Sequence, residues 1–318
     1  IREQSSLCMI PSLMETSGLA NRGVERKGVQ IMCDTETLKK WAEGAMTRRR
    51  FGQVAAASGL AFGAAGCATM AAPSQSGRNV SFATRDGTLD GWFVAPSDVK
   101  RPGVVFWPDI AGLRPAKKAM ASRLASEGHA VLVVNPYYRD VSGQQFEDFA
   151  EFAAKDGFQK VRPWREKLTA DAIMRDAKAA IAWLDTQSEV DSQRGIGTQG
   201  YCMGGPFTFW TAAAVPARVR AAASFHGGGL VRDGASSPHR LADESQAGYL
   251  VAIAQDDDAK DPAATATLRE TFSAIDNPAE IEVYAGDHGW TVPDSPAYAP
   301  QAAERAWERL RALYAREL

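Results

Sequence analysis

Residues 195–206 read G-I-G-T-Q-G-Y-C-M-G-G-P, and this stretch decides the fold. Gly195 to Thr198 is a predicted buried strand, a helix is predicted over 204–214, and G-Y-C-M-G forms the turn between them. Glycines two positions before and two after Cys202 permit a strained turn, because a Cβ there would collide with the strand and helix. This pattern is that of a nucleophile elbow, with cysteine in place of serine, although G-x-C-x-G alone more often marks a buried cysteine. The helix start favours a thiolate, so Cys202 is the predicted nucleophile.

Outward from this turn, short apolar runs alternate with helical periodicity. We predict further strands at 79–84, 89–95, 103–107, 130–134, 221–225, 250–254 and 281–284, and further helices at 115–127, 169–187, 262–275 and 298–316. Apolar strands alternating with helices indicate an α/β protein whose mostly parallel sheet carries helices on both faces. The first two strands form a hairpin through Asp86-Gly87. A hairpin leading into such a sheet is the plan of the α/β-hydrolase fold, in which ligands bind at the carboxyl ends of the strands.

The order of ionisable residues after Cys202 fits the same plan. In this fold the nucleophile is followed by an acid after a later strand and then by a histidine before the last helix. The run Asp256-Asp257-Asp258 follows the strand at 250–254, and His288 follows the strand at 281–284. His226 ends a strand at the same edge but precedes the acid, so we predict that it lines the pocket.

These features make the chain resemble the dienelactone hydrolase family over residues 79–318. The shared motifs are G-Y-C-M-G-G at 200–205, P-D-I-A-G-L at 108–113, N-P-Y-Y-R at 135–139 and G-D-H-G at 286–289. The resemblance implies a hydrolase of small esters or lactones with Cys202 as nucleophile, His288 as base, an acyl-thioester intermediate and no metal or organic cofactor. The strand register selects Asp257 as the third member, whereas the family's D-x-x-x-P spacing, counted back from Pro262, selects Asp258. We favour Asp257.

The resemblance also implies supporting groups for the nucleophile. An acidic residue after an early strand engages the cysteine in the family, and Asp109 occupies that position. The backbone N–H groups of Ile110 and Met203 correspond to the oxyanion hole.

Three further residues are candidates for substrate contact. The family's substrate carries a carboxylate, for which Arg139 beside Tyr138 is the candidate partner. A second arginine, expected shortly after His288, is absent, because Gly-Trp-Thr-Val stands there. Trp290 is predicted to line an aromatic pocket, although it could equally belong to the core.

Composition limits the other function classes. The 318 residues include 36 basic and 38 acidic ones, for a net charge of −2, so no basic field for nucleic acid is expected. Four cysteines without C-x-x-C spacing disfavour zinc sites and a disulfide framework. The expected partner is a small-molecule ester or lactone, and we expect a monomer, although the sequence does not set the oligomeric state. Acyl transfer or thioester hydrolysis on the same three residues, and a non-catalytic exported binding protein, remain alternatives.

The front of the chain has a different character. Residues 46–67 place Arg48 and Arg49 before a weakly apolar Ala/Gly stretch that stops at Cys67, which resembles a twin-arginine export signal. An N-terminal helix with a basic start is the alternative. Ala64-Ala65-Gly66-Cys67 also resembles a lipoprotein cleavage box, so a lipid anchor at Cys67 is the one route to a membrane that the sequence offers, and cleavage near Ala65 or Ala72 is the alternative. We expect periplasmic or otherwise exported protein, residues 1–45 as a disordered extension upstream of the true start at Met46, and 68–78 as a linker.

Residues 140–168 interrupt the alternation of strands and helices. This aromatic, charged stretch is predicted to be helical and forms either a small lid beside the site or a surface helix at the sheet edge.

Overall fold

The computed structural model describes residues 77–97 and 99–318. The predicted extension at 1–45, the export signal at 46–67 and the linker as far as 76 lie outside the described residues. At the end of the predicted linker, Arg78 already begins the first strand. Within the described residues, no helix is long and apolar enough to span a membrane.

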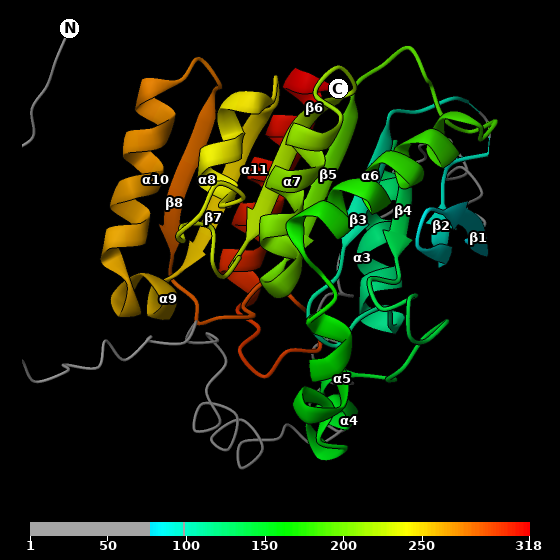
Figure 1. The fold of residues 1–318 in the computed structure, drawn as a ribbon, viewed down its shortest axis with the longest axis horizontal. Coiled ribbons are helices and arrows are strands. Elements are labelled where there is room, and N and C mark those ends of the chain that lie inside the picture. Colours follow the sequence, from blue (N-terminus) through cyan, green and yellow to red (C-terminus); the bar gives the residue numbers. More distant parts are fainter. Residues whose placement is uncertain (1–76, 98) are drawn as a thin grey trace, which may run out of the picture. The chain divides into compact units, whose positions relative to one another are not determined.

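The described part is built on one eight-stranded sheet with the order β1-β2-β4-β3-β5-β6-β7-β8 (Figure 1). The strands are β1 (Arg78–Thr84), β2 (Gly87–Val94), β3 (Gly103–Trp107), β4 (Ala130–Val134), β5 (Ile196–Tyr201), β6 (Val219–Phe225), β7 (Gly248–Ala254) and β8 (Ala279–Tyr284). β1 and β2 form the predicted antiparallel hairpin, β2 also runs antiparallel to β4, and every other pairing is parallel. The predicted α/β-hydrolase plan is confirmed.

Helices cover both faces of this sheet, as predicted. The longer ones are α3 (Pro115–Ser126), α6 (Ala170–Asp185), α7 (Gly205–Ala214), α10 (Pro262–Ala274) and α11 (Pro300–Glu317), and the shorter ones are α4 (Phe149–Ala154), α5 (Gly157–Arg165), α8 (Pro238–Leu241) and α9 (Gln255–Lys260), with 3-10 turns η1 (Cys202–Gly204) and η2 (Ala242–Glu244). β3 shows why two layers form. Val105 and Trp107 pack in the core cluster with α6 and α7, whereas Val104 and Phe106 pack with α3 and α11. The strand is therefore apolar throughout, because both of its faces are buried.

Local sequence signals set several helix ends. Thr169 caps α6 by accepting a hydrogen bond from the N–H of Ala172, and Asp261 caps α10 in the same way from Ala264. Gly128 follows α3 with φ +96°, a conformation that glycine adopts without the Cβ penalty of other residues.

The stretch 140–168 folds into α4 and α5 with the loops around them, beyond the carboxyl ends of the strands (Figure 1). Phe146, Phe149 and Phe152 bury their rings in a separate small core that also includes Ile110. The insert therefore packs on the loop after β3, at the carboxyl ends of the parallel strands.

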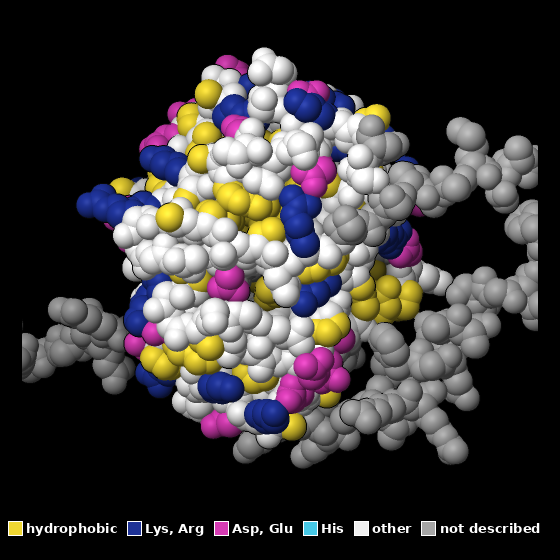
Figure 2. All heavy atoms as spheres, turned by 90° about the vertical axis from the view of Figure 1, so that its right-hand side faces the viewer, with side chains coloured by type: hydrophobic (Ala, Val, Ile, Leu, Met, Phe, Trp, Pro, Cys, Tyr) yellow, Lys and Arg dark blue, Asp and Glu magenta, His cyan; other side chains and the backbone are white. Residues whose placement is uncertain are grey.

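On the face that carries the β1 edge, basic and acidic side chains lie interspersed (Figure 2). This mixture agrees with the near balance of charges in the sequence.

Candidate active site

Cys202 lies in a sharp turn between β5 and α7. Its φ is +53°, a left-handed conformation that is rare for a residue with a side chain and is concentrated at functional sites. β5 ends at Tyr201, η1 spans Cys202–Gly204, and α7 begins at Gly205. The strand-turn-helix context predicted from the sequence is therefore present.

The glycines on either side of Cys202 are required by close packing. A Cβ on Gly200 would lie 2.0 Å from the carbonyl oxygen of Gly204, so no side chain fits there. A Cβ on Gly204 would lie 2.6 Å from the carbonyl oxygen of Trp107 at the end of β3. Both contacts are with backbone, which cannot rotate away, and the spacing of glycines around Cys202 follows from them.

His288 is paired with Asp257, whereas Asp258 has no hydrogen bond or ion pair with His288 among the described residues. Nδ1 of His288 lies 2.6 Å from Oδ2 of Asp257, and both side chains are buried. The preceding Asp256 also contributes, since its Oδ1 accepts a hydrogen bond of 2.8 Å from the backbone N–H of His288. The imidazole is therefore fixed through its ring and through its backbone by two consecutive aspartates of α9.

The surroundings of His288 favour its protonated form. Burial disfavours a charged imidazole, but the neighbouring Cys202 sulfur and the hydrogen bond to Asp257 outweigh it and hold the pKa of His288 well above its ordinary value. A hydrogen bond with the Cys202 sulfur adds to the same shift, so the imidazole interacts with both Asp257 and Cys202. The arrangement suits an imidazolium beside a thiolate.

His226 forms part of the wall next to His288. Its ring centroid lies 4.9 Å from that of His288, and its Nε2 lies 2.8 Å from Oγ1 of Thr291. Burial, aided by the nearby positive charges of His288 and Lys117, holds the pKa of His226 well below its ordinary value. His226 thus lines the cavity in a form that burial keeps neutral.

These groups surround a cavity of about 20 Å³ at the carboxyl edge of the sheet. Its lining residues are Asp109, Ile110, Phe149, Cys202, His226, His288, Gly289, Val292 and Ser295. No arginine or lysine is among them. Within the described residues, no group of three or more His, Cys, Asp or Glu side chains is arranged to hold a metal ion.

The two predicted oxyanion donors lie on different elements. Ile110 lines the cavity, and its backbone N–H donates to no partner within the described residues, whereas its carbonyl accepts a hydrogen bond of 2.8 Å from the hydroxyl of Tyr137. The same hydroxyl lies 3.4 Å from Sδ of Met203. The hydroxyl of Tyr137 therefore connects the loop after β3 to Met203, and it fixes the relative position of the two segments that carry the predicted donors.

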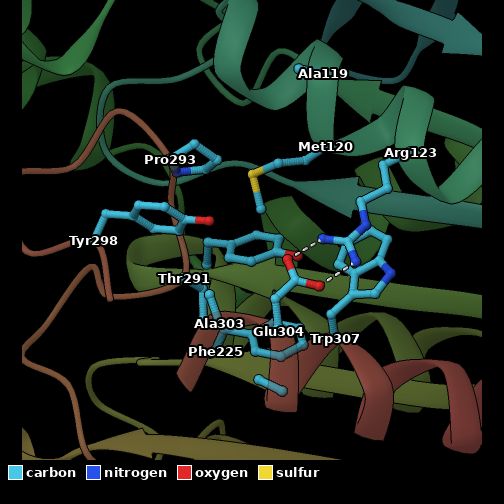
Figure 3. Close-up of a pocket in the computed structure, with 12 residues that line it drawn as sticks. Ala119, Met120, Arg123, Phe225, Thr291, Pro293, Tyr298, Ala303, Glu304 and Trp307 are labelled. Atoms are coloured by element: carbon cyan, nitrogen blue, oxygen red, sulfur yellow. Dashed lines mark hydrogen bonds and ion pairs between the residues drawn. The ribbon is translucent and has the colours of Figure 1, made fainter. Parts of the chain in front are cut away.

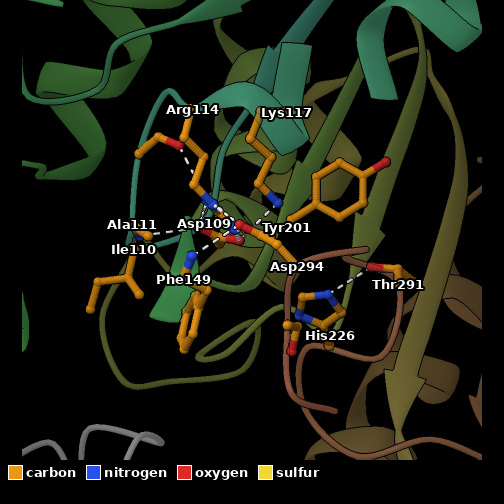
Figure 4. A network of polar contacts seen from close by, with 12 residues as sticks. Asp109, Ile110, Ala111, Arg114, Lys117, Phe149, Tyr201, His226, Thr291 and Asp294 are labelled. Atoms are coloured by element: carbon orange, nitrogen blue, oxygen red, sulfur yellow. Dashed lines mark hydrogen bonds and ion pairs between the residues drawn. The ribbon is translucent and has the colours of Figure 1, made fainter. Parts of the chain in front are cut away.

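Asp109 is the centre of a buried charge cluster (Figure 4). Its two oxygens accept hydrogen bonds from Arg114 at 2.6 and 2.9 Å, and the ammonium of Lys117 lies 2.7 Å away. Although burial opposes ionisation, these two cations hold the pKa of Asp109 well below its usual range. Asp109 lines the same cavity as Cys202, and its charge partners are Arg114 and Lys117; its engagement of Cys202 stays a prediction.

Arg114 connects this cluster to the loop that follows His288. Its guanidinium also binds both oxygens of Asp294, at 2.7 and 2.8 Å, and is itself fully buried. Asp294 in turn accepts a hydrogen bond from the backbone N–H of Phe149, the first residue of α4. The sequence analysis missed Arg114, Lys117 and Asp294. The two cations follow Asp109 closely enough to be suspected, but Asp294 is brought in only by the fold.

Arg139 and Tyr138 were expected to contact the substrate, but neither lines the cavity. The guanidinium of Arg139 binds Asp176 of α6 at 2.8 Å and Asp86 of the β1–β2 turn at 2.7 Å, and the hydroxyl of Tyr138 binds Asp176 at 2.7 Å. Both side chains are used to join the hairpin to α6.

Trp290 also lies outside the cavity lining. It is fully buried, and its ring stacks on that of Tyr284 at a centroid distance of 4.8 Å. Of the two readings that the sequence left open for Trp290, the structure supports the core residue.

The comparisons with known proteins agree with this geometry. The family model described as "Dienelactone hydrolase family" matches residues 89–318. The chain belongs to this family. It is 27% identical over 221 residues to a carboxymethylenebutenolidase of Rhodococcus opacus, a match that covers 68% of this chain and 81% of that relative.

Solved structures of the dienelactone hydrolase family share the fold. The crystal structure described as "Putative Dienelactone Hydrolase" from Klebsiella pneumoniae superposes with a TM-score of 0.65 at 22% identity, covering 76% of this chain and 99% of that one. A dienelactone hydrolase-like promiscuous phosphotriesterase from metagenomic libraries gives a TM-score of 0.59 at 25% identity, covering 76% and 98%. This dienelactone hydrolase family member is thus an ester or lactone hydrolase.

Proposed function

We propose that this hydrolase cleaves its ester or lactone through Cys202, His288 and Asp257, with an acyl-thioester intermediate. The observation that carries the proposal is the 2.6 Å contact between His288 and Asp257 beside a cysteine held at φ +53°. The three side chains come from the ends of β5, β7 and β8, at one edge of the sheet.

In the acylation step, the Cys202 sulfur attacks the carbonyl carbon of the substrate and a C–S bond forms. The carbonyl oxygen becomes an oxyanion, and the N–H groups of Ile110 and Met203 are the candidate donors to it. When the tetrahedral intermediate collapses, the C–O bond to the leaving group breaks. His288 gives its proton to that oxygen, so an alcohol is released from an ester, whereas the alcohol of a lactone stays attached to the acyl chain.

Deacylation reverses the roles. His288, now neutral, removes a proton from a water molecule that attacks the thioester carbonyl. The C–S bond breaks, the carboxylic acid leaves, and the sulfur and imidazole return to their starting state. Asp257 keeps Nδ1 protonated and oriented throughout both steps.

The cavity favours a small substrate that is neutral around its reacting carbonyl. Ile110, Phe149 and Val292 supply apolar walls, and no arginine or lysine lines the space. Asp109 is the carboxylate of the lining. Because the nearest cations, Arg114 and Lys117, are paired with Asp109, a substrate carboxylate would find no available partner there.

We also propose that the protein is exported. The support is the arrangement of Arg48 and Arg49 before the weakly apolar stretch that ends at Cys67, together with a hydrolase domain in which Cys202 is the remaining cysteine. A domain with a single thiol needs no disulfide formation after export.

Identifying the thiol that becomes acylated tests the mechanism. The full chain is mixed with p-nitrophenyl acetate, the first turnover is followed by rapid absorbance measurement, and the acylated peptide is located by mass spectrometry. We expect a burst of nitrophenol stoichiometric with enzyme and an acetyl group on Cys202. Cys202→Ala should be folded and lack both. Full hydrolysis by Cys202→Ala, or acetylation elsewhere with an unmodified Cys202, would contradict the proposal.

A further inference from the structure

A second cavity, of about 150 Å³, lies between α3 and α11 (Figure 3). It shares no lining residue with the catalytic cavity. We propose that it binds a small neutral aromatic molecule, and that binding there changes turnover at Cys202.

The walls of this cavity indicate the class of ligand. Rings of Tyr201, Phe225 and Trp307 and the thioether of Met120 line it, and such groups favour aromatic partners by stacking and sulfur contacts. A cavity of this volume lined by apolar side chains is large enough for a single benzene-sized ring.

The charged groups at the cavity argue against an ionic ligand. Arg123 of α3 and Glu304 of α11 bind each other through two contacts of 2.7 and 2.6 Å, so their charges cancel at the rim (Figure 3). An anion or a cation would have to break this pair. A neutral ring does not.

The hydroxyl of Tyr298 supplies the polar contact. It points toward the middle of the group of lining side chains in Figure 3 and makes no hydrogen bond within the described residues. Partial burial, strengthened by Glu304, raises the pKa of Tyr298, so the phenol stays protonated and can donate. A ligand with one hydroxyl on an aromatic ring therefore fits better than benzene itself.

A single segment separates this cavity from the catalytic one. Thr291 and Pro293 line the second cavity, whereas Val292 between them lines the catalytic cavity. Farther along, Ser295 faces the catalytic side and Tyr298 the other. Residues 291–298 thus form a wall whose two sides belong to two cavities, and a ligand on one side contacts the segment that shapes the other.

Two more contacts connect the wall to the reacting groups. Oγ1 of Thr291 holds Nε2 of His226, whose ring lies against that of His288. Tyr201 and Phe225, in the floor of the second cavity, directly precede Cys202 and His226. Any shift of the floor or wall on binding therefore reaches the nucleophile and the base through adjacent residues.

The probe for the test is phenol, and its binding is measured by calorimetry on the full chain and on Cys202→Ala. We expect saturable binding of one phenol with a dissociation constant on the order of 1 mM, equal in both proteins, because Cys202 is not in this cavity. Tyr298→Phe should weaken phenol but leave toluene binding unchanged, and benzoate should bind at least tenfold more weakly than phenol.

The position of binding is tested by filling the cavity. Ala303→Phe on α11 places a ring into it, and Ala312→Phe places the same ring on the exposed side of the same helix. We expect phenol binding to disappear in Ala303→Phe and to persist in Ala312→Phe. If Ala303→Phe folds and binds phenol as the unmodified protein does, the ligand lies elsewhere and the proposal is overturned. Absence of binding to the unmodified protein would overturn it as well.

The coupling is tested by measuring ester hydrolysis at increasing phenol concentration. We expect kcat to change at least twofold over the concentration range that saturates binding, in the unmodified protein and Ala312→Phe but not in Ala303→Phe. An unchanged kcat at saturation would refute the coupling. Should the chain hydrolyse no ester, the binding measurements on Cys202→Ala still decide whether the site exists, so this failure is distinguishable from failure of the proposed function.

Discussion

The pairing of Asp257 with His288 predicts a large difference between two adjacent aspartates. Asp257→Asn keeps the shape of the side chain but replaces a carboxylate oxygen 2.6 Å from Nδ1 by a group that favours the wrong tautomer. In serine triads this change lowers kcat by about 10⁴, and we expect a loss of about 10³ to 10⁴ here. At 1.36 kcal/mol for each factor of ten, the loss corresponds to about 4 to 5.5 kcal/mol of barrier.

Asp258→Asn is the matched control, because Asp258 has no hydrogen bond or ion pair with His288 among the described residues, and it should retain activity within about twofold. Both variants are assayed with p-nitrophenyl acetate after thermal unfolding has confirmed that they fold. The pH profile adds a second readout. Since Asp257 helps to raise the pKa of His288, and acylation needs the protonated imidazole, its loss should move the alkaline limb of the kcat/KM profile to lower pH. A larger loss in Asp258→Asn, or less than a tenfold loss in Asp257→Asn, would refute the reasoning.

Three other predictions follow from the charges of the structure and the front of the sequence. Arg139→Ala should lower the free energy of unfolding by about 3 kcal/mol, because Asp176 stays buried without its partner. KM should change equally for anionic and neutral esters. A selective rise in KM for anionic esters would show that Arg139 binds substrate. Alkylation of Cys202 by iodoacetamide should persist below pH 7, because the raised pKa of His288 keeps the imidazole positively charged there. This charge is lost only as the pH rises through the pKa of His288. In His288→Ala the midpoint of the pH dependence of alkylation should move toward about 8.5, and an unchanged midpoint would contradict the ion pair. Replacing Arg48 and Arg49 by lysine should leave unprocessed protein in the cytoplasm, as seen by fractionation, and undiminished export would dismiss the signal.

Much of the fold could be predicted because its strands are buried on both sides and bounded by clear turns. β3 and β4 have the predicted bounds. β5 runs past Thr198 to Tyr201, because Gln199 and Gly200 pair with β3 while Tyr201 pairs with β6. Polar and glycine residues hid this extension, since hydrogen bonding between backbones is indifferent to side-chain type.

The acidic run after β7 forms the helix α9 (Gln255–Lys260), which is not among the helices predicted from the sequence. Three aspartates in its first turn interact favourably with the helix dipole. Helix propensity and apolar periodicity do not include this interaction, and six residues are too few to show a period. The helix matters for the site, because it directs Asp256 to the backbone of His288 and Asp257 to its ring.

The position of Arg139 shows what local sequence cannot determine. A cation next to the functional edge can bind a substrate or a carboxylate of the protein, and the choice depends on partners from other parts of the chain. Here Asp86 and Asp176 supply those partners. The spacing of glycines around Cys202 had no such freedom, because a Cβ at Gly200 or Gly204 would collide with backbone atoms of the same turn or of β3.

The buried cluster around Arg114 explains how segments distant in sequence stay aligned. A sheet fixes the ends of its strands, but the loops beyond those ends carry Ile110 and Val292, which both line the cavity. Arg114 binds Asp109, next to Ile110, and Asp294, two residues after Val292, so one planar group links the two loops. Burying these charges has a desolvation cost, and apolar side chains of similar volume would stabilise the folded protein about as well. The paired hydrogen bonds from Arg114 to Asp109 and to Asp294 instead allow one relative position of the two loops. The proposed site needs this fixed position, because the N–H donor at Ile110 and the loop that carries His288 have to face the same carbonyl group.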